Sequence, residues 1–229
     1  MKVKCAAGNT GCSAAWLDPV LKLSTSPRTA SSPDSAPGVK AETVAARQKA
    51  EISIKQLFKD DYRNAKSPME QLKFARKLLQ HANETIDDPV SRYVLLCQSR
   101  DFAIAAGVAK TALQAVDELA AHFQVEPLEE KRDVLVKVTK TARSPLTARA
   151  LAVESLHVLD EAIAVDRYSI ALRLCRVASE SAKKARDPDL VKLAGASQKH
   201  VVRLQQQHET ASAAISDLKT NPNNENANL

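Results

Sequence analysis

The side chains best suited to metal or acid–base chemistry are the histidines, and their spacing suits neither role. The chain contains five: His81, His122, His157, His200 and His208. The closest two, His200 and His208, would lie about 12 Å and about 80° apart on a helix. A zinc site needs ligands that converge on one ion. We therefore expect no metal site and no cofactor.

Adjacent carboxylates are the next candidates for acid–base chemistry. The pairs are Asp60-Asp61, Asp87-Asp88, Glu129-Glu130 and Asp160-Glu161. Neighbouring side chains on a helix point about 100° apart, so such a pair cannot straddle one substrate atom. Two pairs, Asp87-Asp88 and Glu129-Glu130, stand at predicted helix starts, where negative charge is favoured. We interpret all four as helix caps or solvated surface.

No nucleophile stands in a recognisable setting. No serine lies in a G-x-S-x-G pattern, and Gly8–Gly11 lacks the lysine of a phosphate-binding loop. Cys5 and Cys12 fit no zinc spacing. Cys97 and Cys175 fall on apolar helical positions, where cysteine behaves as a small hydrophobic residue. The sequence therefore predicts no catalytic residue, and the chain is not expected to be an enzyme.

Basic residues form two clusters that nucleic acid could contact. One is Lys73, Arg76 and Lys77, and the other is Lys183, Lys184 and Arg186. Acidic residues lie close by, and only Phe74 offers the interleaved aromatic that single-strand binding uses. The net charge is +6, but residues 1–40 hold five Lys or Arg against two Asp or Glu. Nucleic acid is therefore not the favoured partner.

The hydrophobic pattern does not decide the role of Arg100. It lies on an apolar stripe between Leu96 and Ile104. Such an arginine is either buried against a carboxylate, for which Asp117 and Glu118 are candidates, or it faces a groove. A structural ion pair is the favoured interpretation.

Composition indicates that the elements around these residues are helices. About one of the 229 residues in six is alanine, aromatics are 3%, and there are five glycines. Few β-branched or aromatic runs argue against a sheet. The chain is therefore expected to be all-α.

Capping residues predict where these helices start. Ser67, Asp88, Ser144 and Asp187 each precede a proline, which suits a first helical position. Asp166 is expected to cap a helix that starts at Arg167. Gly107 is expected to end the helix that starts near residue 89. The complete set of eight starts is near residues 41, 68, 89, 109, 127, 145, 167 and 188.

The starts recur about every twenty residues, so helical pairs recur about every forty, as in α-solenoids. Two helices open with an aromatic, Tyr93 or Tyr168, and continue with small residues. We predict antiparallel hairpins stacked as a short, tetratricopeptide-like α-solenoid, with a four-helix-bundle pair as the alternative. In the first helix Ile54, Leu57 and Phe58 are expected on the packed face.

Three segments follow from this pattern. Residues 1–39 are predicted to be a disordered segment or linker, 40–219 the helical-repeat domain, and 220–229 a disordered tail. In the last helix, apolar residues from Leu190 to Leu218 follow a spacing that allows a coiled coil. This helix is expected either to cap the solenoid or to mediate self-association.

Membrane and export signals are weak. No stretch of eighteen apolar residues occurs, so no membrane span is expected. The basic start Met1–Lys4 is followed by Gly8–Gly11 where an export signal has an unbroken apolar stretch. The compartment is unknown from sequence, with a cytoplasmic location as the default.

Four stretches resemble a helical region found in many planctomycete proteins: Phe58–Tyr62, Asp87–Gly107, Ala115–Phe123 and Leu218–Leu229. The resemblance covers about residues 50–229. It implies a region of larger exported or surface proteins, beside carbohydrate-directed, lectin-like or sulfatase-modifying-type domains, and hence an exported or periplasmic location. Relatives usually continue further, so we expect this chain to be a truncated or differently started relative. No catalytic residue is implied.

The leading hypothesis is a non-catalytic protein-interaction or spacer module that binds an unidentified protein or peptide in a groove. One alternative, implied by the resemblance, is an accessory region of a carbohydrate- or sulfate-ester-related enzyme. A second, suggested by the pI near 9.1, is a weak basic nucleic-acid binder.

Overall fold

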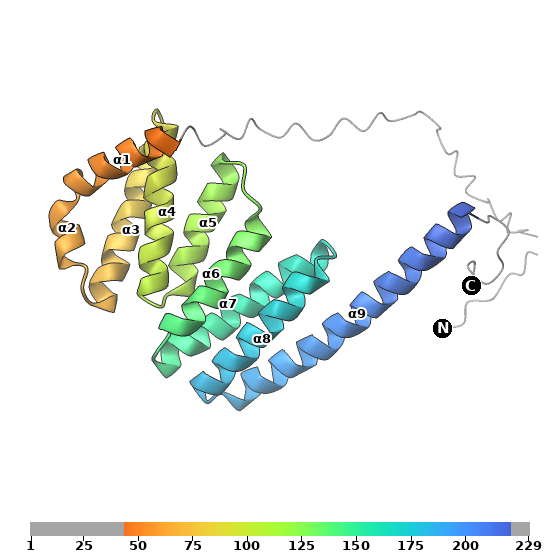
Figure 1. Cartoon of the computed structure of the whole chain (residues 1–229). Coiled ribbons are helices and arrows are strands. Elements are labelled where there is room, and N and C mark those ends of the chain that lie inside the picture. The colour runs from red at the N-terminus through yellow and green to blue at the C-terminus, as the bar shows by residue number, and fades with distance from the viewer. Residues whose placement is uncertain (1–43, 221–229) are drawn as a thin grey trace, which may run out of the picture. The chain divides into compact units, whose positions relative to one another are not determined.

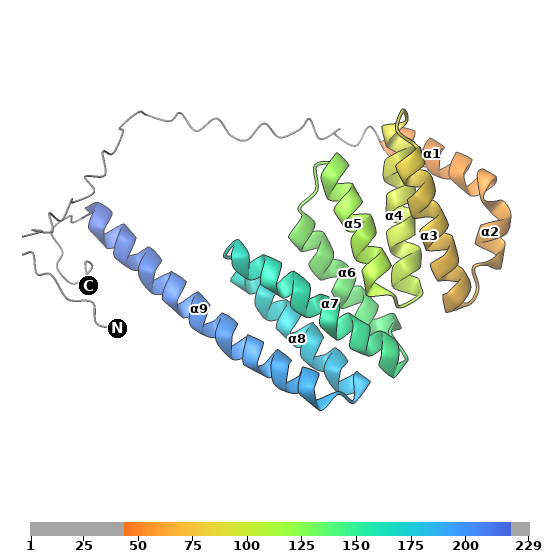
Figure 2. The same cartoon turned by 180° about the vertical axis from the view of Figure 1, so that it is seen from behind.

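A computed structural model describes residues 44–220, and all regular structure in this range is helical (Figures 1 and 2). Its helices are α1 (Val44–Leu57), α2 (Lys59–Asn64), α3 (Pro68–Glu84), α4 (Pro89–Ala105), α5 (Ala109–His122), α6 (Pro127–Thr141), α7 (Pro145–Ala164), α8 (Tyr168–Ala185) and α9 (Pro188–Thr220). The predicted segment 1–39 and the tail 220–229, except Thr220, lie outside the described residues.

Four helix starts are set by side-chain caps, as predicted. Ser67 and Ser144 each accept a hydrogen bond from the backbone N–H of the third helical residue, in capping boxes. Asp88 and Asp187 accept equivalent bonds at 3.0 and 3.1 Å. Because proline occupies the first helical position after each cap, its missing N–H leaves no donor unsatisfied.

Residues with positive φ mark helix ends, and the capping role predicted for Asp166 is wrong. Gly107 has a φ of 74° and ends α4, as expected. Asp166 does not cap α8. Its φ is 58°, and its N–H bonds to the carbonyl of Ile163 at 3.1 Å, so it closes the C-terminus of α7. The Asp166 carboxylate accepts a hydrogen bond from the Tyr168 hydroxyl at 2.6 Å.

The first predicted helix is divided in two at Phe58. No glycine or proline stands at the bend. Instead the Phe58 side chain is buried and packs against Phe74, with ring centroids 5.9 Å apart, and against His81 at 5.1 Å. The bend turns Leu57 outward, where it is 76% exposed, so its predicted place on the packed face is wrong.

Apart from the short α2, the described helices pack in two sets, which we call row A (α1, α4, α6 and α8) and row B (α3, α5, α7 and α9). Consecutive helices along the chain contact one another, and each helix also contacts the next member of its own row. The most extensive contacts are α7 with α8 and α3 with α4. Within the described part, contact is therefore between near neighbours in chain order, and α3 does not touch α9.

Small residues allow the closest of these contacts. The facing sides of α7 and α8 carry fully buried Ala152 and Ala162, and Ala171 and Ala178 respectively. Alanine side chains allow the axes of two helices to approach closely. Larger residues fill the spaces between the pairs, and Leu159 is 1% exposed.

Substitution by alanine is expected to have opposite effects on stability at two glycines. A Cβ on Gly107 would lie 2.9 Å from the Thr141 carbonyl oxygen, and its left-handed backbone disfavours a side chain. A Cβ on Gly195, within α9, would meet nothing within 4 Å. We expect Gly107→Ala to lower the free energy of unfolding by about 1–2 kcal/mol and Gly195→Ala to raise it by about 1 kcal/mol. Urea unfolding followed by circular dichroism measures both, and a shift of the same sign in the two variants would contradict this interpretation.

Candidate functional site

Arg100 forms a structural ion pair, but not with either carboxylate named from the sequence. Its guanidinium lies 3.0 Å from Glu130 of α6 and 3.0 Å from Asp101, and its side chain is 18% exposed. Burial alone would lower the pKa of Arg100, but the carboxylates outweigh burial and raise it. Asp117 instead pairs with Lys131, and Glu118 with Arg92. Arg100 thus joins α4 to α6.

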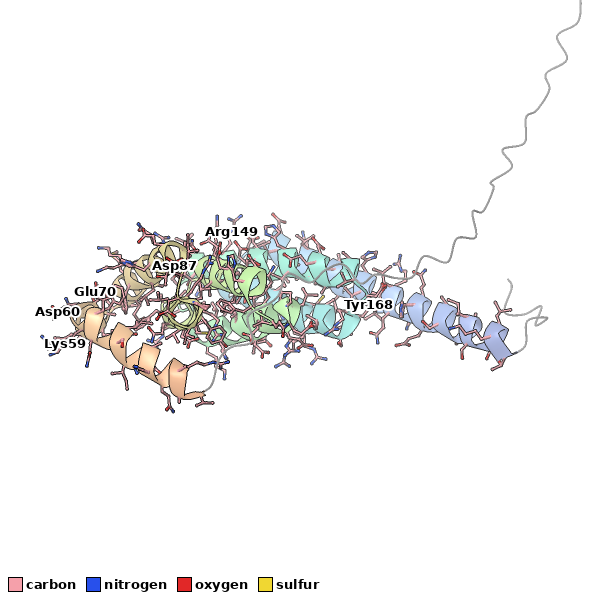
Figure 3. All side chains as sticks on the ribbon, turned by 90° about the horizontal axis from the view of Figure 1, so that it is seen from above. Lys59, Asp60, Glu70, Asp87, Arg149 and Tyr168 are labelled. Atoms are coloured by element: carbon pink, nitrogen blue, oxygen red, sulfur yellow. The ribbon has the colours of Figure 1, made fainter. Side chains whose placement is uncertain are left out.

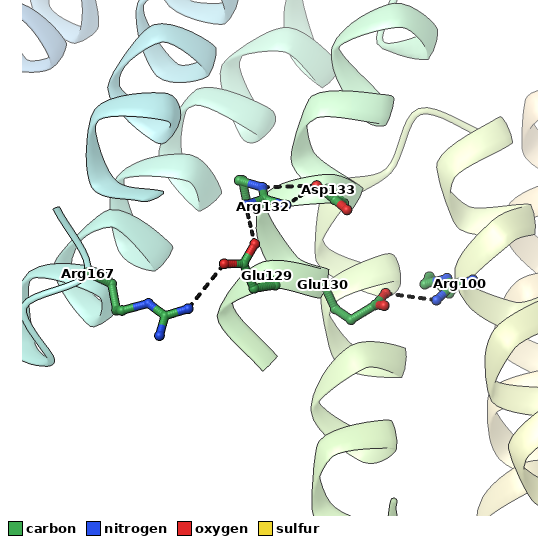
Figure 4. Close-up of polar contacts among 6 residues, drawn as sticks. All are labelled: Arg100, Glu129, Glu130, Arg132, Asp133 and Arg167. Carbon is green, nitrogen blue, oxygen red and sulfur yellow. Dashed lines mark hydrogen bonds and ion pairs between the residues drawn. The ribbon is translucent and has the colours of Figure 1, made fainter. Parts of the chain in front are cut away.

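Glu130 belongs to a run of five charged residues, Glu129–Asp133, in the first turns of α6. Since successive side chains point about 100° apart, the run reaches several neighbours at once (Figure 4). Glu129 binds Arg167, which precedes α8, at 3.1 Å, and also pairs with Arg132. Arg132 in turn contacts Asp133 at 2.8 Å.

Lys131 is the buried member of this run. It is 8% exposed, and its ammonium lies 2.8 Å from Asp117 of α5 and 2.7 Å from Glu161 of α7. Burial alone would lower the pKa of Lys131, but the hydrogen bonds to the two carboxylates outweigh burial and raise it. Lys131 is therefore charged at neutral pH and links row A to two helices of row B.

The α6 and α8 helices run in the same direction and are joined near both ends. Near their N-termini, Arg167 contacts Glu129. Near their C-termini, the Lys184 ammonium donates a hydrogen bond to the carbonyl oxygen of Thr139 at 2.8 Å. The two contacts hold the helices at a fixed spacing while leaving the surface between them open.

A groove occupies this surface. Two adjoining hollows share Val136 and Arg173 and so form one depression, the α6–α8 groove. Its lining consists of Arg132, Asp133, Val136, Thr139 and Lys140 from α6 and Ser169, Arg173, Arg176, Val177 and Glu180 from α8. Val177 is buried and Val136 half-buried, whereas Lys140, Arg173 and Arg176 are exposed. The groove thus has an apolar floor and a basic rim.

Sequence reasoning missed Arg173 and Arg176, although a signal existed. Leu174 and Cys175 separate them in sequence, so they do not form a run. Their spacing of three nevertheless places them on one helix face. Of the clusters named from sequence, Lys184 contacts Thr139 of α6 and Lys77 pairs with Asp61 of α2 at 2.7 Å.

Part of the apolar stripe of α9 packs against other helices of the chain. Ala194 and Val201 are buried against the other helices. His208 packs on the ring of Tyr168, with centroids 5.4 Å apart, and Figure 3 shows Tyr168 beside α9. Beyond it, Ala211 and Ile215 are exposed. Self-association through Leu190–Leu218 stays a prediction.

His81, His122, His157 and His208 lie close to other side chains of the chain. His122 and His157 lie near Glu118 and Glu154, at 3.5 and 3.9 Å. Among the residues described, no three His, Cys, Asp or Glu side chains gather closely enough to hold a metal ion. Burial raises the pKa of the Cys97 thiol, and it raises the pKa of Cys175 to about 11. Both thiols are therefore protonated at neutral pH, whereas the reactive form is the thiolate.

Comparisons with protein-family models, with curated proteins and with solved structures find no match to this chain. Within residues 44–220, every helix is too short or too polar to cross a bilayer.

The burial of Lys131 makes a prediction about stability. Replacing it with alanine leaves two carboxylates without their shared cation and removes a packed alkyl chain. We expect Lys131→Ala to lower the free energy of unfolding by about 1–3 kcal/mol at pH 7, less than for a fully buried pair because both carboxylates are half-exposed. Because the raised pKa is a folded-state property, this difference is fully present below the pKa of an unfolded lysine. It falls as the pH rises through the folded pKa.

Lys137 provides the matched control on the same helix. It is exposed, and Lys137→Ala should change the free energy of unfolding by less than about 0.5 kcal/mol. Urea unfolding of both variants at neutral and alkaline pH measures the difference. Equal destabilisation by the two substitutions would show that Lys131 does not hold α6 in place.

Proposed function

We propose that residues 40–219 form a non-catalytic protein-interaction module built from tetratricopeptide-like helical repeats, with the α6–α8 groove as its binding surface. The observation that carries the proposal is the pair of parallel helices joined near both ends with an open groove between them. In stacked helical repeats, such surfaces bind extended peptides or other proteins.

The pattern of helix contacts supports the repeat architecture. Each helix of row A contacts the next in that row, and row B does the same, while successive helices pair across the rows. A closed bundle would instead bring its first and last helices around one core. On this proposal the chain is a relative of the planctomycete helical region that Phe58–Tyr62 and Asp87–Gly107 resemble.

The use of charged groups supports a binding role rather than catalysis. Arg100, Lys131, Glu129 and Glu130 are engaged in joining helices. By contrast, the cations of the basic rim of the groove, on α6 and α8, join none of the described helices. A rigid surface binds with little loss of conformational entropy.

A site-specific photo-crosslinker tests the proposal. Placed at Thr139 in the groove, it should capture a partner protein in the source cells, whereas the same group at Lys192, an exposed position on α9, should not. Val136→Trp fills the floor of the groove and should abolish capture from Thr139. The exposed substitution Ala213→Trp on α9 should leave it unchanged.

Melting curves of the tryptophan variants show whether each remains folded. Equal capture from Thr139 and Lys192, or capture that survives Val136→Trp in a folded chain, would contradict a specific binding surface. Absence of capture from both positions would favour a spacer role.

A further inference from the structure

Within the described part of the chain, the lining of the α6–α8 groove has more unpaired cations than unpaired carboxylates. Among residues 44–220, Lys140, Arg173 and Arg176 have no carboxylate within ion-pair distance, whereas Arg132, also in the lining, pairs with Glu129 and Asp133. The remaining lining carboxylate is Glu180. Three free cations therefore face one free carboxylate across a small surface.

We propose that this groove binds an acidic peptide segment of a partner protein. The inference rests on the proposed function and names the chemistry of its ligand. Guanidinium groups favour carboxylates because their planar set of donors can form two parallel hydrogen bonds to one carboxylate. Arg173 and Arg176 lie three residues apart, about 4.5 Å along the helix axis, and Lys140 lies across the groove on α6.

The dimensions of the groove suit a short segment. From Arg132 to Lys140, α6 rises about 12 Å, which matches about four residues of extended chain. Successive side chains of an extended peptide point to opposite sides. Acidic side chains can therefore reach the arginines while an intervening apolar side chain lies on Val136 and Val177. The expected ligand alternates Asp or Glu with small apolar residues.

The lining favours a peptide over nucleic acid. Asp133 and Glu180 stand among the cations and would repel a continuous phosphate backbone. The described residues that line the groove include no aromatic side chain on which a base could stack, and stacking supplies much of the energy of single-strand binding. A peptide can instead direct its backbone N–H groups toward the two carboxylates.

The test measures binding of labelled peptides to the purified full chain by fluorescence anisotropy. The probes are a peptide of alternating Glu and Val, the same peptide with Gln for Glu, and a single-stranded oligonucleotide of equal charge. We expect the acidic peptide to bind at least about tenfold more tightly than the Gln peptide and the oligonucleotide. Its affinity should fall as salt is added, because the contacts lie at the surface.

Two charge-reversal variants locate the binding site. Arg173→Glu with Arg176→Glu should weaken binding of the acidic peptide at least about tenfold. Lys73→Glu with Arg76→Glu is the matched control, because these exposed cations have the same spacing on α3 in row B, and it should weaken binding less than about twofold. Circular dichroism melts confirm that both variants fold.

Several results would overturn the assignment. Equal losses in the two variants would show that general charge, and not the groove, attracts the peptide. Tighter binding of the oligonucleotide, lost with Arg173→Glu and Arg176→Glu, would assign the groove to nucleic acid. Failure of the acidic peptide to bind, while Thr139 still captures a partner in cells, would leave the interaction module standing and remove the acidic ligand.

Discussion

The position of α6 depends on charge more than that of any other helix in row A. Four of its residues are buried, and one of these is Lys131. Its contacts with α5 and α7 are much less extensive than that of α7 with α8. The ammonium between Asp117 and Glu161, together with Arg100–Glu130 and Arg167–Glu129, therefore adds to the attachment that the buried side chains of Val134, Leu135 and Val138 provide. Half-exposed ion pairs are individually weak. Because the ion pairs of α6 point in several directions, together they fix its rotation about its own axis and its position along that axis.

The contrast between α6 and its neighbours also explains where the groove lies. The small residues of α7 and α8 allow close packing between these two helices. The α6 helix meets α8 through long polar side chains at both ends, so Val136 and Val177 are left as the floor of a depression. The groove is therefore a consequence of how α6 is attached, and substitutions that loosen this attachment should alter the groove even when they do not line it.

Local features could be predicted from the sequence, and relations between helices could not. Ser67, Asp88, Ser144 and Asp187 act within one turn, so residue type and spacing are sufficient to identify them. The error at Asp166 arose because an aspartate can either cap a helix or adopt the left-handed conformation that ends the preceding helix. Here the N–H of Asp166 bonds to the carbonyl of Ile163, which ends α7. The partner of Arg100 depends on the rotation of α6 about its own axis, which no short-range pattern encodes. Leu57 was misplaced for a similar reason, since the bend at Phe58 follows from tertiary packing on Phe74.

The free cations of the groove are informative because no ion pair among residues 44–220 uses them. Arg173 and Arg176 lie three residues apart, where like charges repel by a few tenths of a kcal/mol, about 0.2–0.5. Their side chains are exposed, so they contribute little packing in return. Other cations that lie between helices have polar partners there: Lys131, Arg92 and Arg149 pair with carboxylates, and Lys184 donates to the carbonyl of Thr139. In the described part of the chain, Lys140, Arg173 and Arg176 have no such partner and stand beside an apolar floor. This arrangement suits a ligand that brings negative charge to the α6–α8 groove.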